Sequence, residues 1–180
     1  MLNLASITRD VGISEPTAKR WLSILRTSGI VYLLRPYSNN SIKRAVKTPK
    51  LYFLDTGLAA YLTRWLTVET LRLGAMNGAF FESFVVSEIL KSYTNAGKEV
   101  DLYFLRDSNQ REIDILIHEN NTLYPLEIKT SSEPNPNDIK HFTMLEEIKN
   151  VNIGEGGVIC LADELLPLKD KHKIIPLWAI

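Results

Sequence analysis

The chain has 180 residues, 45% of them hydrophobic, which is enough for one domain or two small ones with a packed core. A single cysteine, Cys160, excludes an internal disulfide, and the sequence has neither a signal-peptide pattern nor an apolar run long enough to cross a membrane. We therefore expect a cytoplasmic protein without a membrane partner. The net charge is zero, but residues 1–50 hold nine basic and two acidic residues, a net charge of +7 that leaves −7 for the rest. This split predicts a domain boundary near residue 50 and a basic N-terminal part suited to nucleic acid or to an acidic protein surface.

The first 27 residues have the pattern of a helix-turn-helix. Apolar residues at helical spacing predict a first helix up to Val11, Gly12 begins the turn, and Ser14 is a suitable N-cap for a second helix. An apolar stripe from Ala18 to Leu25 leaves the polar side chains of the second helix facing away. The second helix of such a motif can enter a major groove of DNA. Its candidate DNA contacts are Thr17, Lys19, Arg20 and Ser23.

Residues 30–50 are expected to add a wing to this motif. Residues 30–35 are strand-like, residues 36–41 form a loop, and Lys43 and Arg44 follow on or beside the wing, where they could contact phosphates. Winged helices also serve as connectors between proteins or domains, so DNA contact and connection both stay open.

The next stretch of chain is mainly helical. A short strand over residues 51–54 leads through Asp55, a helix cap, into a helix over residues 58–65, and residues 67–73 continue helically. A longer helix over residues 79–91 carries Glu82 on its apolar stripe. A carboxylate on a buried face needs a partner, because burying a lone charge is costly.

A hairpin over residues 112–130 organises the C-terminal part. Polar and apolar residues alternate on both sides of an Asn-Asn pair, which predicts two strands and a tight turn. The register then sets Asp114 opposite Glu127 and Glu112 opposite Lys129, all on one face. The apolar residues expected on the other face are Ile113, Ile115, Ile117, Leu126 and Ile128.

Two facing carboxylates repel each other, and a divalent cation would offset that repulsion. Mg²⁺, or Mn²⁺ in its place, is commonly held by one or two carboxylates together with water and phosphate oxygens. The alternative is an exposed hairpin face with an ordinary Glu-Lys pair.

The remaining segments complete an α/β pattern. A strand over residues 99–106 precedes the hairpin, and a helix over residues 138–149 and strands over residues 158–162 and 174–178 follow it. This order predicts an α/β core with a mixed sheet. The sequence has no G-x-x-x-x-G-K-[ST] motif, so we expect no ATPase activity in this chain.

The spacing of Asp114, Glu127 and Lys129 resembles the signature of the PD-(D/E)xK, or restriction-endonuclease-like, superfamily. More narrowly, the chain resembles the DUF4143 C-terminal region of prokaryotic AAA-type ATPases over nearly its whole length. The motifs that carry this resemblance are R-E-I-D-I-L-I, Y-P-L-E-I-K-T-S, K-L-Y-F-L-D-T-G-L at residues 50–58, F-E-S-F-V-V-S-E-I at residues 81–89 and I-P-L-W at residues 175–178.

The resemblance implies a winged helix-turn-helix module over residues 1–50 and an endonuclease-like α/β domain over residues 51–180. The resemblance also implies that Asp114 and Glu127 bind the metal, that Lys129 positions the attacking water, and that Glu82 completes the site. Glu82 could instead pair with Lys129 or Arg111 for structure. The implied ATPase domain is absent from this chain. The expected function is therefore that of a Mg²⁺-dependent DNA phosphodiesterase, or else of a non-catalytic DNA-binding or regulatory module of such an ATPase.

Overall fold

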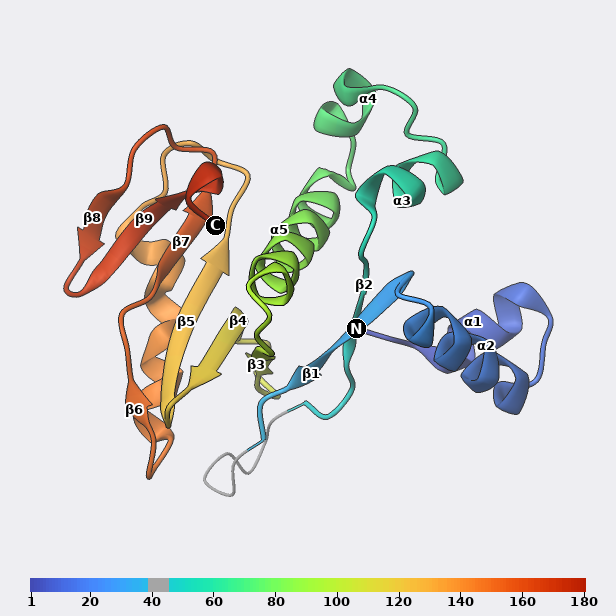
Figure 1. Ribbon diagram of the computed structural model, residues 1–180, viewed down its shortest axis with the longest axis horizontal. Coiled ribbons are helices and arrows are strands. Elements are labelled where there is room, and N and C mark those ends of the chain that lie inside the picture. The colour runs from blue at the N-terminus through green and yellow to red at the C-terminus, as the bar shows by residue number, and fades with distance from the viewer. Residues whose placement is uncertain (39–45) are drawn as a thin grey trace.

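The computed structural model describes residues 1–38 and 46–180, and its centre is one mixed β-sheet (Figure 1). Within those residues nine strands follow the order β2-β1-β3-β4-β5-β7-β9-β8, with β6 beside β5. The strands are β1 (Val31–Pro36), β2 (Lys50–Phe53), β3 (Asp101–Arg106), β4 (Glu112–Glu119), β5 (Thr122–Ile128), β6 (Asn152–Ile153), β7 (Gly157–Cys160), β8 (Leu166–Lys169) and β9 (His172–Pro176). The predicted α/β class with a mixed sheet is confirmed, since β1–β3 and β5–β7 pair in parallel whereas β3–β4 and β4–β5 pair antiparallel.

Two long helical elements cover opposite faces of this sheet. The helices are α1 (Leu4–Val11), α2 (Glu15–Thr27), α3 (Thr56–Leu62), α4 (Val68–Leu73), α5 (Asn77–Asn95) and the 3₁₀ helices η1 (Pro136–Glu147) and η2 (Leu177–Ala179). On the α5 side, Val85 packs with Ile115 and Leu126, and on the η1 side Leu145 packs with Leu116. Because Ile115 and Leu116 are neighbours in one strand, they point to opposite faces and define the two halves of the core.

The N-terminal helices begin and end where the sequence predicts. Ser14 accepts a hydrogen bond from the backbone N–H of Thr17 at 3.3 Å and caps α2, and Gly12 takes φ 73° in the turn before it. Of the apolar stripe on α2, only Ala18 is buried, and Trp21 remains 51% exposed. The wing residues Lys43 and Arg44 lie outside the described residues.

The central hairpin has the predicted register and turn. The pairs run from Glu119 with Thr122 to Ile115 with Leu126, which is the register that predicted Asp114 opposite Glu127 at the next position. Asn120 and Asn121 have φ values of 49° and 56°, as a type I′ turn requires at both central positions.

A β-bulge changes the direction of the first residues of β4. Tyr103 pairs with Leu116 but Leu105 pairs with Ile113, so one residue of β3 faces two residues of β4. Ile113 therefore packs on the η1 side, whereas Ile115 packs on the α5 side. The prediction that Ile113 shares a face with the other apolar hairpin residues is wrong, because the bulge reverses the alternation.

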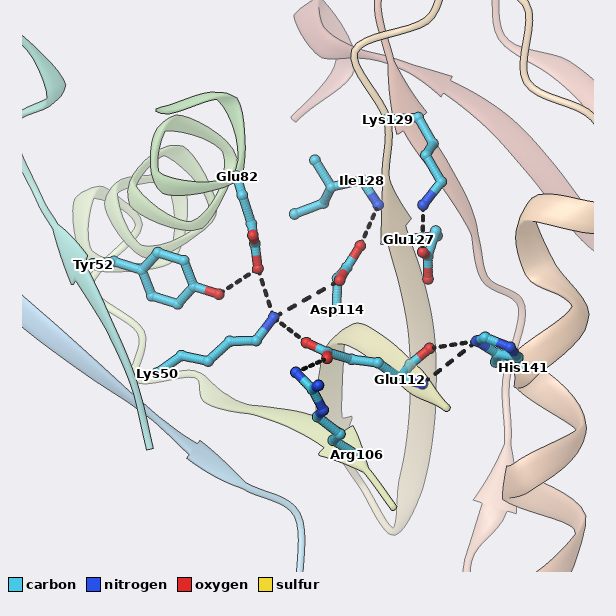
Figure 2. A network of polar contacts seen from close by, with 10 residues as sticks. All are labelled: Lys50, Tyr52, Glu82, Arg106, Glu112, Asp114, Glu127, Ile128, Lys129 and His141. Carbon is cyan, nitrogen blue, oxygen red and sulfur yellow. Dashed lines mark hydrogen bonds and ion pairs between the residues drawn. The ribbon is translucent and has the colours of Figure 1, made fainter. Parts of the chain in front are cut away.

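The bulge also divides the polar residues that we expected on one face. Glu112 and Asp114 turn toward Lys50 on the α5 side of the sheet. Glu127 lies between Leu126 and Ile128, whose side chains pack on the α5 side, and its own carboxylate pairs with Lys129 (Figure 2). The prediction of one continuous polar face is therefore wrong.

The sheet is continuous across residue 50, where we predicted a domain boundary. β2 begins at Lys50 and pairs with β1, and β1 pairs in turn with β3 of the C-terminal part. The short strands β6 and β8 were not predicted, and η1 begins two residues before the helix predicted over residues 138–149, because Asn135 caps it with a capping box. Over the described ranges, the helices are too short or too polar to cross a membrane.

Candidate functional site

Lys50, at the start of β2, occupies the centre of a network of carboxylates from two elements, α5 and β4 (Figure 2). Its Nζ donates to Oε1 of Glu82 on α5 at 2.7 Å, pairs with Glu112 on β4 and lies 3.8 Å from Oδ1 of Asp114. The Lys50 side chain is only 11% exposed. Burial by itself lowers the pKa of Lys50, but the charges of Glu82, Asp114 and Glu112 outweigh it and raise the pKa to about 12. Lys50 is therefore a charged ammonium at neutral pH.

Tyr52 shares Oε1 of Glu82 with Lys50, and Arg106 binds the outer oxygen of Glu112. The Tyr52 hydroxyl donates to Oε1 of Glu82 at 2.5 Å, and Nη1 of Arg106 lies 2.9 Å from Oε2 of Glu112. Burial and the charge of Glu82 raise the pKa of Tyr52, so its hydroxyl keeps the proton that it donates. Lys50 and Tyr52 reach the same carboxylate because alternate residues of a strand share a face.

The partner of Glu82 differs from both partners that we considered for a structural role. The predicted structural partners were Lys129 and Arg111, whereas Glu82 pairs with Lys50 and Tyr52. Arg111 instead binds Asp107 within its own loop, with Nε 2.7 Å from Oδ2.

Asp114, Glu127 and Lys129 form the second part of the site. Oδ2 of Asp114 accepts a hydrogen bond from the backbone N–H of Ile128 at 3.0 Å, which fixes Asp114 across the hairpin. Nζ of Lys129 donates to Oε1 of Glu127 at 2.6 Å. The Lys129 side chain is 37% exposed, so this lysine reaches solvent from the edge of the site.

Glu127 is buried with half of its carboxylate unbound. It is 7% exposed, and its Oε2 atom is the only buried side-chain oxygen or nitrogen of residues 1–38 and 46–180 without a hydrogen-bond partner. Burial, followed by the charge of Asp114, raises the pKa of Glu127 to about 8. Burial, followed by the charge of Glu82, also raises the pKa of Asp114. With a pKa of about 8, Glu127 is mostly protonated at neutral pH, and a cation bound at this point would replace that proton, satisfy the free oxygen and offset the repulsion between the two ionised carboxylates.

His141 on η1 supports the start of β4 from the other face. Its Nδ1 lies 3.4 Å from the backbone nitrogen and 3.2 Å from the backbone oxygen of Glu112. This contact ties η1 to the strand that carries Asp114.

The donor set of Asp114 and Glu127 fits a magnesium ion that completes its shell with water. Mg²⁺ is usually held by one or two protein carboxylates. Across the described part of the chain no group of three or more His, Cys, Asp or Glu residues could hold a metal ion. The three carboxylates that do converge, Glu82, Glu112 and Asp114, converge on Lys50.

The candidate DNA contacts lie away from these carboxylates. Thr17, Lys19, Arg20 and Ser23 are on α2, which lies on the far side of β1 and β2 from the central hairpin (Figure 1). Thr17 takes part in the N-cap of α2, and Lys19 pairs with Glu15 at 2.6 Å. Arg20 and Ser23 are exposed on the surface.

Three members of the network were not predicted from the sequence: Lys50, Tyr52 and Arg106. Lys50 counted as one more charge in the basic N-terminal block, and it lies 32 residues from Glu82 in sequence. Lys50 directly precedes the strand predicted over residues 51–54, and its spacing of two residues from Tyr52 was the one local signal, since that spacing sets both side chains on one face if the strand begins at Lys50.

The fold and the site define an α/β protein that carries carboxylates and lysines together at its central hairpin. The family model described as Domain of unknown function (DUF4143) matches residues 77–180, and the chain belongs to this family. A second family model, Domain of unknown function (DUF8612), matches residues 1–69. The site draws on both regions, since Lys50 and Tyr52 fall in the second match and the carboxylates in the first.

Two longer mycobacterial proteins are similar to nearly the whole chain. They are named Uncharacterized protein Rv2008c of Mycobacterium tuberculosis and Uncharacterized protein Mb2031c of Mycobacterium bovis, and each is 26% identical over 175 residues. The match covers 96% of this chain but 37% of each relative, so the chain spans little more than a third of the length of these relatives. No solved structure matches the chain.

Proposed function

We propose that this chain is a metal-dependent nuclease of the PD-(D/E)xK type with an N-terminal winged helix that binds DNA. The observation that carries the proposal is the free Oε2 of Glu127, buried beside Asp114 at the open end of the hairpin. A buried carboxylate oxygen without a partner is costly, so Glu127 holds a proton at neutral pH until a cation replaces it.

In this proposal Asp114 and Glu127 would hold Mg²⁺ or Mn²⁺. When bound, the cation would supply Lewis-acid stabilisation of a phosphodiester and lower the pKa of an attacking water. Lys129 remains beside Glu127, where its partly exposed ammonium can orient that water or stabilise charge on the phosphate. Glu82 would act as a positioning residue, because its carboxylate binds Lys50 and Tyr52.

The N-terminal part supports DNA binding as a second half of the proposal. Two helices joined by a short turn precede the antiparallel β1–β2 pair, the order of a winged helix, and residues 1–50 carry the net positive charge. Thr17, Lys19, Arg20 and Ser23 would contact DNA from α2, with Lys43 and Arg44 beside the wing. The family resemblance leads us to propose further that an AAA-type ATPase domain accompanies this region in the longer relatives.

The test is cleavage of linear, circular and single-stranded DNA by the purified chain with Mg²⁺ or Mn²⁺. We expect Asp114→Asn and Lys129→Ala to reduce metal-dependent cleavage by about 100-fold or more while the chain stays folded. Glu155→Gln, a change to an exposed carboxylate outside the site, is the matched control and should cut like the wild type. Unchanged cleavage in both site variants would refute the assignment.

A non-catalytic module that binds DNA or regulates an ATPase is the second candidate function. It is favoured by the ion pairs that already neutralise the site, since Lys50 binds Glu82 and Glu112, and Lys129 binds Glu127. This candidate predicts salt-dependent DNA binding without turnover, and no rise in melting temperature when Mn²⁺ is added.

A further inference from the structure

The carboxylates around Lys50 are arranged as ligands around a cation. Glu82 comes from α5 and Glu112 and Asp114 come from β4, yet one oxygen of each faces the same ammonium nitrogen, two in direct contact and the third at 3.8 Å. Tyr52 adds a hydroxyl to Glu82, and Arg106 takes the outer oxygen of Glu112. The inner oxygens therefore have Lys50 as their common partner.

This cluster shares Asp114 with the proposed metal site. Asp114 lies next to Lys50 on one side and next to Glu127 on the other (Figure 2). In phosphodiesterases that use two metal ions, the ions lie about 3.5–4 Å apart. If the ammonium of Lys50 were a metal ion, Asp114 would be a carboxylate shared between two ions. Glu127 would bind the first ion, and Glu82 and Glu112 would bind the second.

We propose that Lys50 is the resident cation of this site: its ammonium takes the place of a second divalent ion, so that the chain binds one metal ion, at Asp114 and Glu127. The inference rests on the proposed function. An ammonium is a compact point charge with three donors, so it can bind several carboxylates at once, but it cannot act as a Lewis acid. Since Lys50 lies in β2, the N-terminal part of the chain would determine how many metal ions the C-terminal hairpin holds.

The experiment counts bound Mn²⁺ from the electron paramagnetic resonance signal of the free ion during titration of the chain. We expect the wild type to bind about one Mn²⁺ and Lys50→Met to bind about two, because the variant leaves three converging carboxylates without a cation. Lys50→Arg keeps a cation and should bind about one. Lys47→Met removes an exposed lysine three residues away and should also bind about one.

A further variant assigns the added ion to its ligands. Lys50→Met/Glu112→Gln should return the count to about one, because Glu112 contributes to the Lys50 cluster and has no place in the Asp114–Glu127 pair. Melting curves give a second readout. In EDTA, Lys50→Met should be less stable than the wild type, and added Mn²⁺ should raise the melting temperature of the variant back toward that of the wild type.

The outcomes separate this inference from the proposed function. Two ions in the wild type, or one ion in both the wild type and folded Lys50→Met, would overturn the role of Lys50 and leave the nuclease proposal standing. No ion in the wild type and one in Lys50→Met would refute the metal site at Asp114 and Glu127 while Lys50 keeps its cation role. No ion in either would refute both, and failure of Lys50→Met to fold even with Mn²⁺ would count against the cation role.

Discussion

At the scale of single residues, the site depends on hydrogen bonds that compensate buried charge. Glu82 is the clearest case, because its side chain is 26% exposed and two donors meet at its Oε1. Lys50 neutralises the carboxylate, and the Tyr52 hydroxyl satisfies it further. Each donor should therefore contribute separately to stability.

Tyr52→Phe removes one of these donors and leaves the shape of the side chain unchanged. We expect the free energy of unfolding in EDTA to fall by about 1–2 kcal/mol, as for the loss of a hydrogen bond to a charged group. The Mn²⁺-induced rise in melting temperature should persist, since Tyr52 does not contact Glu127. Urea denaturation measures the first effect, and Tyr61→Phe, at a residue 64% exposed, is the control. Equal stability of Tyr52→Phe and wild type would mean that Lys50 alone satisfies Glu82.

Asp107 shows the same compensation in the loop between β3 and β4. Its Oδ1 accepts hydrogen bonds from the backbone N–H groups of Asn109 at 2.8 Å and Arg111 at 3.0 Å, and Oδ2 binds the Arg111 side chain. Burial favours the neutral acid, but these hydrogen bonds outweigh it and lower the pKa of Asp107 below its usual range.

The lowered pKa gives Asp107 a defined effect on acid stability. A carboxyl group with a depressed folded-state pKa stabilises the fold above its unfolded pKa of about 3.9, and that stabilisation is lost as the pH falls through the folded-state value. Asp107→Asn should therefore cost about 1–2 kcal/mol at pH 7 and less at pH 2–3. Urea denaturation across this range measures the difference, with the exposed Asp163→Asn as control. A difference that does not shrink in acid would contradict the ionic role of Asp107.

At the scale of elements, local pattern was sufficient wherever neighbours in sequence determine the structure. The Asn-Asn pair and the alternation around it predicted the β4–β5 register, and Ser14 and Asp55 cap the helices that they were expected to cap. The bulge in β4 was not predictable in the same way, because it depends on how β3 pairs with Asp114 and Ile115.

In the candidate site, too, contacts between neighbours in sequence could be predicted and long-range contacts could not. The closeness of Asp114 and Glu127 follows from the register of one hairpin and could be predicted, whereas the partner of Glu82 could not. Lys50 reaches Glu82 only because β1 pairs with both β2 and β3, a long-range contact that no periodicity in the sequence encodes.

The hairpin turn gives a test at this scale. Asn121 has φ 56°, a backbone conformation that a β-branched residue adopts only with strain. We expect Asn121→Val to lower the free energy of unfolding by about 1–2 kcal/mol, and Asn121→Gly to raise it by about 0.5 kcal/mol. Glu119→Val, at the exposed last residue of β4, is the control for a β-branched side chain placed beside the turn in extended backbone. Equal stability of Asn121→Val and wild type would show that the turn does not constrain the hairpin.

At the scale of the whole molecule, the sheet joins the two halves of the sequence into one core. Leu34 of β1 is fully buried in the same cluster as Val85 of α5 and Phe104 of β3. The ion pair between Lys50 of β2 and Glu82 of α5 also joins the two halves. The charge split at residue 50 predicts two domains, whereas the packing predicts that the C-terminal part requires β1 and β2.

Two truncated chains decide between these expectations. A fragment of residues 51–180 lacks β1 and Lys50, so it exposes the edge of β3, a cavity at Leu34 and unpaired carboxylates; we expect it to lose cooperative unfolding. A fragment of residues 29–180 lacks only α1 and α2, which contain one buried residue, Ala18, and it should unfold cooperatively. Urea denaturation followed by circular dichroism measures both. Cooperative unfolding of the shorter fragment would establish residues 51–180 as a domain that folds alone, and the pairing of β1 with β3 would then be an interface between domains.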